Sequence, residues 1–217
     1  MKKALEYIRS DYHRYYGGGG NNSLTIKIIL LALIARNHCF TYIFWMRLAK
    51  ARKPISLIAR SKLRRLQKKY GIQIPYTTQI GYGFYIGHGV GIVVNGRTKI
   101  GNNVNISQFL SIGSNKGTPA TIGDNVYIGP HVSIVEDVKI GDKATIGAGA
   151  VVVKDVPTGS TVAGNPAKAI SDRTHPKYIQ NKKPNKSNNS LHITRYSNKQ
   201  LSRRINQLVC YGLFEFI

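Results

Sequence analysis

A histidine at position 88 stands between two glycines in the stretch IGHGVGIVVN, which is otherwise aliphatic. Neutral imidazole has an unperturbed pKa of about 6.5, so it is well suited to take a proton from an attacking hydroxyl near neutral pH. General-base help of this kind typically raises a rate by ~10²–10⁴. His88 is therefore the first candidate catalytic residue, and a surface histidine without a chemical role is the alternative.

The elements that must hold His88 follow a six-residue repeat. An aliphatic residue returns at every sixth position through most of the middle of the chain, a period that is neither helical nor alternating. The repeated positions are Ile74, Ile80, Ile86, Ile92, Ile100, Ile106, Ile112, Ile122, Ile128, Ile134, Ile140, Ile146 and Val152. This is the signature of a hexapeptide β-helix. The sequence therefore predicts a mainly β fold, a left-handed parallel β-helix over residues 74–170.

Two steps in the repeat are longer than six residues. The step from Ile92 to Ile100 is eight and the step from Ile112 to Ile122 is ten, so two and four extra residues are expected to form surface loops there. With about eighteen residues per coil and these insertions, one outward ladder is expected, made of His88, Gln108, Pro130 and Ala148. The small residues at its end suit a groove for a long, thin cofactor.

The segments on either side of the repeat differ from it. Residues 24–50 and 55–71 are predicted helices separated at Pro54. They belong to a basic leader, residues 1–73, which is expected to form an N-terminal α-helical cap on the open end of the coils. Residues 171–217 are polar, basic and aperiodic, so a disordered C-terminal tail is expected.

Positive charge is concentrated in these flanks. The net charge of +23 divides into +14 for residues 1–73, +2 for residues 74–170 and +7 for residues 171–217. Each basic residue close to an anionic membrane surface contributes ~1 kcal/mol to binding. The first apolar run, residues 28–35, is shorter than the ~20 residues that span a bilayer. We therefore expect peripheral contact with the inner face of the cell membrane, with a solvated helix face as the alternative.

Other classes of partner find little support in the residues. No nucleic-acid fold motif accompanies the basic flanks, so nucleic acid is not an expected partner. The two cysteines, Cys39 and Cys210, show neither metal-ligand spacing nor a disulfide framework, and no metal is expected. The N-terminal residues lack the apolar region of a secretory signal, which favours a cytoplasmic location.

Two stretches, HGVGIVVNGRTKIGNNVNISQFLSIG and TIGAGAVVVKDVPTGSTVAGNPAKAI, resemble hexapeptide acyltransferases of the serine acetyltransferase-like branch. The closer resemblance is to O-acetyltransferases of colanic acid and capsular polysaccharide biosynthesis, which share a basic helical leader running into IxxxxxIGxGFxIxHGxGIVVN. The resemblance covers about residues 74–170. It implies an acetyl-CoA-dependent O-acetyltransferase that forms a homotrimer with sites between neighbouring β-helices, and it makes His88 the general base.

The resemblance also implies where acetyl-CoA binds. Small residues in GAGAVVVKD would let the pantetheine arm lie against the coil, and lysines there and in GNPAK would meet the CoA phosphates. The implied CoA-binding residues are Pro130, Gly147, Ala148, Lys154 and Lys168. Solvated lysines are the alternative for the two cations.

Two further residues are candidates for contact with the substrate or a neighbouring subunit. Gln108 is the polar neighbour of His88 in the expected ladder. Asn95 lies at the edge of the first insertion, and the turn chemistry of Asn95-Gly96 explains it equally well.

Three departures from serine acetyltransferases proper bear on the acceptor. Their catalytic histidine follows an acidic residue, where this chain has Gly87. Their arginine-histidine pair in the next loop is absent, since Thr118 here precedes Pro119. A short basic leader replaces their larger acidic helical domain. These departures favour a sugar hydroxyl of a surface polysaccharide or its lipid-linked precursor. Serine O-acetyl transfer in cysteine biosynthesis is the alternative, and a non-catalytic β-helix scaffold is a further one.

Overall fold

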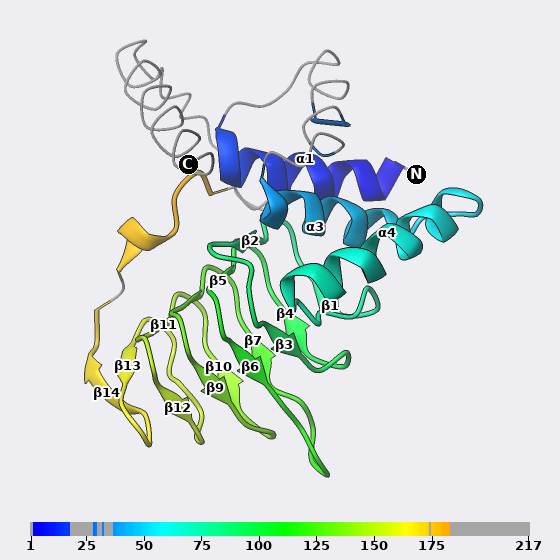
Figure 1. The fold of residues 1–217 in the computed structure, drawn as a ribbon. Coiled ribbons are helices and arrows are strands. Elements are labelled where there is room, and N and C mark those ends of the chain that lie inside the picture. The colour runs from blue at the N-terminus through cyan, green and yellow to red at the C-terminus, as the bar shows by residue number, and fades with distance from the viewer. Residues whose placement is uncertain (1, 18–27, 30–31, 33–36, 174, 183–217) are drawn as a thin grey trace, which may run out of the picture. The chain divides into compact units, whose positions relative to one another are not determined.

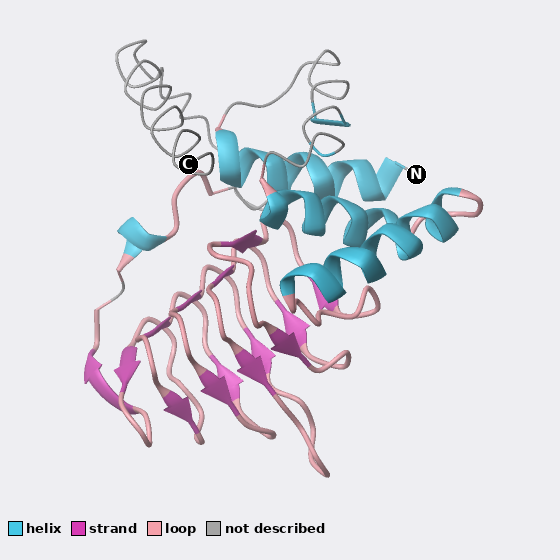
Figure 2. Cartoon of the chain, viewed as in Figure 1, coloured by secondary structure: helices cyan, strands magenta, loops and turns pink. Residues whose placement is uncertain are grey.

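The computed structural model describes residues 2–17, 28–29, 32, 37–173 and 175–182, all within one compact unit of residues 1–183. Figure 1 shows the described helices grouped at one end of a stack of short strands, which are parallel except for the last. Figure 2 shows the strands, in magenta, lying on the faces of this stack and joined by loops at its corners. The prediction of a parallel β-helix with an N-terminal helical cap is confirmed.

The strands form three sheets, one on each face of the coils. Sheet I contains, in order, β1 (Gln79–Ile80), β4 (Lys99–Ile100), β7 (Thr121–Ile122) and β10 (Lys139–Ile140). Sheet II contains β2 (Tyr85–Ile86), β5 (Asn105–Ile106), β8 (Tyr127–Ile128), β11 (Thr145–Ile146), β13 (Thr161–Ala163) and β14 (Lys168–Ser171). Sheet III contains β3 (Val93–Val94), β6 (Ser111–Ile112), β9 (Ser133–Ile134) and β12 (Val151–Val152).

The core is a column of aliphatic side chains from these strands. In each strand from β1 to β12 the second residue is buried, and it is always Ile or Val. Its partner in the next coil is the same kind of residue, as in the pairs Ile80–Ile100 and Ile100–Ile122. Burial of such a side chain is worth ~1.5–3 kcal/mol, so repetition through the coils supplies most of the driving force for the fold.

The strand register shows that one of the two expected insertions lies at a different place in the sequence. Ile86 pairs with Ile106, twenty positions on, whereas Val94 pairs with Ile112, eighteen positions on. The two extra residues therefore lie between Ile86 and Val94, and the expectation that they follow Ile92 is wrong. Ile92 and Val94 are both buried, so apolar spacing alone does not say which of them occupies the strand.

The helices of the cap are α1 (Lys2–Tyr16), α3 (His38–Leu48) and α4 (Ile55–Tyr70). The Asn37 side chain accepts a hydrogen bond from the Phe40 N–H at the start of α3. Pro54 precedes α4, and Gly71 ends it in the left-handed conformation at φ 65°. Most of the first half of the helix predicted over residues 24–50 lies outside the described residues. No described helix is both long and apolar enough to cross a bilayer.

Side chains of the cap replace the hydrogen bonds that a preceding coil would have made. The Ile86 N–H and carbonyl, on the open edge of sheet II, both pair with the Tyr15 hydroxyl. The Phe84 N–H donates to Asp11, and Arg47 donates to the carbonyl of Ile80. An exposed sheet edge is prone to unwanted pairing, so the cap protects the first coil as well as covering its core.

At the other end, β14 runs antiparallel to β13 and closes sheet II. The chain then returns along the coils, where Tyr178 stacks on Tyr127 with ring centroids 4.6 Å apart. Asn105 donates to the Tyr178 carbonyl, and Ile179 is buried. The segment around Tyr178 and Ile179 therefore packs against the coils, within the range expected for the C-terminal tail. Residues 183–217 lie outside the described part of the chain.

Candidate active site

His88 lies on the corner between β2 of sheet II and β3 of sheet III. This corner holds the two-residue insertion that the register reveals, so His88 belongs to a loop larger than its counterparts in later coils. The side chain is exposed. Within the described residues no hydrogen bond or ion pair engages its ring, so the imidazole faces outward with both nitrogens available for chemistry.

Helix α3 packs directly against the backbone of this corner. A Cβ added to Gly89 would lie 2.9 Å from Ile72 Cδ1 and 3.0 Å from Cys39 Sγ. The Cys39 thiol also lies 3.7 Å from the Gly87 carbonyl oxygen. Burial raises the pKa of Cys39 to about 11, so this thiol stays neutral and acts as a packing group. The cap therefore fixes the position of the loop that carries His88.

Replacing Gly89 by alanine should destabilise this corner, whereas replacing Gly87 should not. Alanine at position 89 must displace Ile72 and Cys39, and such overpacking typically costs ~1–3 kcal/mol. A Cβ on Gly87 would meet nothing closer than 3.6 Å. Urea unfolding of the two variants measures the difference, and equal midpoints would show that α3 does not hold the corner.

The outward ladder exists, but its first member differs from the expectation. His131 N–H donates to the Gln108 carbonyl and Gly149 N–H donates to the Pro130 carbonyl, which places Gln108, Pro130 and Ala148 in one column. The same hydrogen bond in the first coil runs from Phe109 N–H to the Val90 carbonyl. Val90 therefore occupies the position expected for His88. The inserted residues displace the imidazole along the corner, so Gln108 does not lie directly above it.

An exposed aromatic pair borders this ladder and was not among the predicted site residues. Phe109 and His131 both adopt positive φ angles, 57° and 58°, and their rings stack with centroids 4.6 Å apart. Phe109 is 47 % exposed and also covers Gly91, whose Cβ position would be 2.5 Å from the ring. Positive φ is unusual for a bulky residue. A phenylalanine in a corner position suited to Asn or Gly was the signal in the sequence that could have identified the pair.

The other predicted site residues are more dispersed. Asn95 lies on the next corner, between sheets III and I, where its side chain accepts from Arg97 N–H in a local turn. The turn explanation for Asn95 is therefore the one that the described contacts show. Exposed Lys154 follows β12 at that same corner, and exposed Lys168 lies in β14. Gly147 directly precedes Ala148, and a Cβ on it would lie 3.0 Å from Ala163.

The four-residue insertion forms a loop held by two neighbouring carboxylates, Glu136 and Asp137, and the Thr118 N–H donates to Asp137 at 2.8 Å. Glu136 accepts hydrogen bonds from the backbone N–H groups of Asn115, Lys116 and Gly117, at 2.7, 2.9 and 2.7 Å. These bonds lower the pKa of Glu136 below its ordinary value of 4.5. Glu136 therefore fixes the backbone that leads directly into Thr118 and Pro119.

This loop should loosen in acid. Because the folded pKa of Glu136 is lowered, its stabilising effect is complete above about 4.5 and is lost as the pH falls through the lower, folded value. Amide chemical shifts of residues 115–117 should therefore titrate together below the ordinary glutamate range. Glu136→Gln should remove that transition, and a midpoint at or above the ordinary value would contradict the assignment.

No group of His, Cys, Asp and Glu side chains suited to a metal ion occurs within the described residues. The corner itself offers an exposed imidazole at His88 and the N–H groups of its turns, with the amide of Gln108 in the adjoining ladder.

Comparison with known proteins finds coils similar to these in acetyltransferases. The family Bacterial transferase hexapeptide (six repeats) matches residues 119–154. Serine acetyltransferase 4 of Arabidopsis thaliana is 38 % identical over 125 residues, which cover 56 % of this chain and 34 % of the relative. Serine acetyltransferase of Buchnera aphidicola is 33 % identical over 139 residues, which cover 62 % of this chain and 50 % of that protein. The chain thus spans a third to a half of these curated relatives.

A solved structure shares both the coils and part of the cap. Neisseria gonorrhoeae serine acetyltransferase superposes with a TM-score of 0.64 at 28 % identity, covering 81 % of this chain and 70 % of that one. Serine acetyltransferases recur among the similar sequences and structures, and nothing supports the polysaccharide O-acetyltransferase branch. The expectation of a surface-polysaccharide acceptor is therefore wrong, and the alternative agrees better with the comparisons. The chain therefore contains hexapeptide repeats of the bacterial transferase kind, and its coils are similar in sequence and fold to those of serine acetyltransferases.

Proposed function

We propose that this protein transfers an acetyl group from acetyl-CoA to the hydroxyl of L-serine, with His88 as the general base. The observation that carries the proposal is the exposed His88 imidazole on an enlarged corner, beside the ladder that leads to Ala148. The similarity to serine acetyltransferases supports both the donor and the acceptor.

The reaction needs no covalent enzyme intermediate. His88 removes the proton from the serine hydroxyl as its oxygen attacks the thioester carbonyl carbon, which gives a tetrahedral oxyanion. Backbone N–H groups at the coil corners are the donors available to stabilise that charge. The C–S bond then breaks, the imidazolium returns its proton to the leaving thiolate, and O-acetylserine and free CoA result.

The CoA would lie along the ladder on the coil surface. Gln108 and Pro130 are half-buried and Ala148 is exposed, so this column presents little bulk to a pantetheine arm. Gly147 continues the small-residue surface. We assign the phosphates to exposed Lys154 and Lys168, which lie near the last coil, although on different faces.

The acceptor can be tested through Gly87, the position where serine acetyltransferases carry an acidic residue. A side chain fits there, because the nearest atom to an added Cβ is the Ile106 carbonyl oxygen at 3.6 Å. Gly87→Asp would place a carboxylate beside His88 and should raise kcat/KM for L-serine. The assay is thiol release from acetyl-CoA, with O-acetylserine identified by mass. Absence of that product from the wild-type protein would overturn the proposal.

The homotrimer implied by the resemblance is part of the same proposal. In that arrangement a neighbouring β-helix supplies the second wall of the site, and residues near Asn95 are the ones assigned to face it. Sedimentation at several protein concentrations is the test. A fully active monomer would show that the site is complete within one chain.

Contact with an anionic membrane surface is also proposed, on the evidence of α4. Leu57 and Ile58 are 53 % and 56 % exposed, and Arg52 and Lys53 precede them on the same exposed segment. Apolar side chains beside cations suit the boundary of anionic headgroups. Flotation with phosphatidylglycerol vesicles should capture the wild-type protein and not Leu57→Glu/Ile58→Glu.

A further inference from the structure

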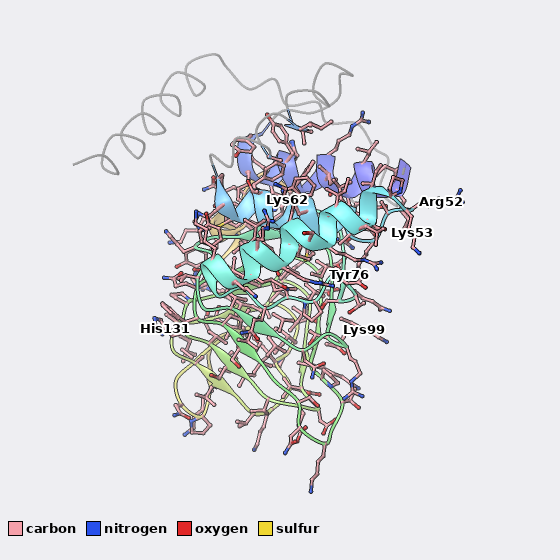
Figure 3. All side chains as sticks on the ribbon, turned by 45° about the vertical axis from the view of Figure 1, so that its right-hand side comes forward. Arg52, Lys53, Lys62, Tyr76, Lys99 and His131 are labelled. Carbon is pink, nitrogen blue, oxygen red and sulfur yellow. The ribbon has the colours of Figure 1, made fainter. Side chains whose placement is uncertain are left out.

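A pocket of about 760 Å³ lies on the face of sheet I, away from the His88 corner. Its walls come from the start of α1, the turn between α3 and α4, and strands β1, β4 and β7. Figure 3 shows Arg52 and Lys99 on one side of the molecule and His131, which borders the ladder, on the opposite side. The pocket is thus separate from the surface assigned to acetyl transfer.

The charge of this pocket is entirely positive. Its lining includes five cationic residues and no Asp or Glu among the described residues; the cations are Lys3, Arg47, Lys50, Arg52 and Lys99. They come from segments far apart in the chain, so the fold gathers them. Like charges held in one concave site repel each other, and field lines focused by low-dielectric walls attract an anion.

The cations do not all have protein partners to neutralise them. Arg47 does, since it forms a buried ion pair with Asp11 at 2.8 Å and also donates to the carbonyls of Ile80 and Gly81. Lys50 makes one described hydrogen bond, to the Thr78 carbonyl, which carries no charge. Burial first and then the charge of Arg47 lower the pKa of Lys50, which means that both disfavour its charged form. An anion bound beside Lys50 would stabilise that charged form.

The apolar part of the lining comes mainly from the helical cap. Ala4, Tyr7 and Ala51 are half-buried and line the pocket beside the cations. Ile80, Ile100 and Ile122 also lie along it, but their side chains belong to the core column and are only 6 %, 5 % and 2 % exposed, so they offer a ligand little surface. Such a site suits a phosphate group attached to a small or apolar body.

We infer that this pocket binds a phosphate-bearing anion. Lys50, Arg52 and Lys99 contact the phosphate, and the apolar lining from the cap contacts the rest of the ligand. The inference goes beyond the proposed acetyl transfer and does not depend on it. The phosphate can belong to a soluble metabolite or to a lipid that ends in a phosphate, because a phosphate monoester presents the same dianionic group in both cases.

Lys99 provides the test, because the chain contains a matched control for it. Lys99 in β4 and Lys139 in β10 are both exposed, lie in the same sheet and pair in register with Thr121 between them. Only Lys99 lines the pocket. Calorimetric titration with pyrophosphate should show binding that Lys99→Glu weakens by about tenfold or more, whereas Lys139→Glu should leave it close to the wild-type value.

Further titrations distinguish a lipid phosphate from a soluble one, and they test whether the anion binds in this pocket or at the proposed CoA site. Dihexanoyl phosphatidic acid, a soluble lipid phosphate, should bind more tightly than pyrophosphate if the apolar lining of the pocket contacts a lipid tail, and no better if the ligand is a free phosphate compound. Loss of binding in Lys154→Glu but not in Lys99→Glu would place the anion at the assigned donor site and overturn the inference. Equal losses in Lys99→Glu and Lys139→Glu, or no binding of either probe, would overturn it as well. His88→Ala should bind both probes with wild-type affinity. A failure of the proposed acetyl transfer can therefore be distinguished from a failure of anion binding in the pocket.

Discussion

Replacing His88 by alanine should lower the rate of CoA release with L-serine by about 10²–10⁴-fold, the usual contribution of a general base. The side chain is exposed and makes no described hydrogen bond, so its loss should not disturb the fold. Thiol release from acetyl-CoA measures the rate, and circular dichroism with sedimentation verifies that the variant keeps its structure and assembly.

A matched control is available on the same side of the coils. His131 is also an exposed histidine, and its ring stacks on Phe109 instead of standing free. His131→Ala should keep most of the activity, because that ring is assigned no proton-transfer step. If His88→Ala retained the wild-type rate, the corner would be a scaffold and the non-catalytic alternative would hold. A strong loss in both variants would instead indicate that the rim formed by Phe109 and His131 takes part in binding.

Much of this site could be predicted because the six-residue repeat lets positions in successive coils be matched by counting along the sequence. Aliphatic residues at every sixth position specify the inward side chains and therefore the corners, and the ladder of Gln108, Pro130 and Ala148 follows from that count. The count failed where two apolar residues compete for one strand. Ile92 and Val94 both reach the core, and only backbone pairing shows that Val94 forms the strand. His88 consequently lies in the insertion, a position that spacing could not assign.

The substrate assignment failed for a different reason. Gly87 and Thr118 are local departures, and they were given more weight than the similarity of the coils as a whole. The structure shows that each departure has a local setting: Gly87 has room for a side chain, and the loop containing Thr118 is held by Glu136. The absence of one acidic or basic side chain in one loop changes how an acceptor is held. It does not by itself decide whether the acceptor is serine or a sugar, because the other residues around the corner also contact the acceptor.

The position of the helical cap could be predicted, but the contacts that attach it to the coils could not. The contacts that join it to the coils link Asp11 with Phe84 and Tyr15 with Ile86, across more than seventy residues of chain. A basic leader suggested a partner outside the molecule. Part of that charge instead has partners within the protein. Arg47 is only 4 % exposed, pairs with Asp11 and donates to the Ile80 carbonyl at the open edge of the first coil.

Arg47→Met should therefore be strongly destabilising. The guanidinium forms the buried pair with Asp11 and also donates to the carbonyls of Ile80 and Gly81. Methionine retains much of the apolar stem but leaves the carboxylate buried without its cation. Breaking one partner of a buried pair typically costs about 3–5 kcal/mol, and urea unfolding should show a loss of that size in the free energy of unfolding.

Two further variants distinguish the effect of breaking the ion pair from the effect of removing any arginine of the cap. Arg60 donates to the Ala49 carbonyl and lies over the Tyr76 ring, but it is half-buried and pairs with no carboxylate. Arg60→Met should cost less than about 1.5 kcal/mol, the range for one net hydrogen bond or cation–π contact. In the double variant Asp11→Asn/Arg47→Met the uncompensated charge is gone, so the combined loss should be smaller than the sum of the single losses. Strict additivity would mean that Arg47 acts through the strand-edge carbonyls alone, and that the cap is held by hydrogen bonds rather than by its buried charge pair.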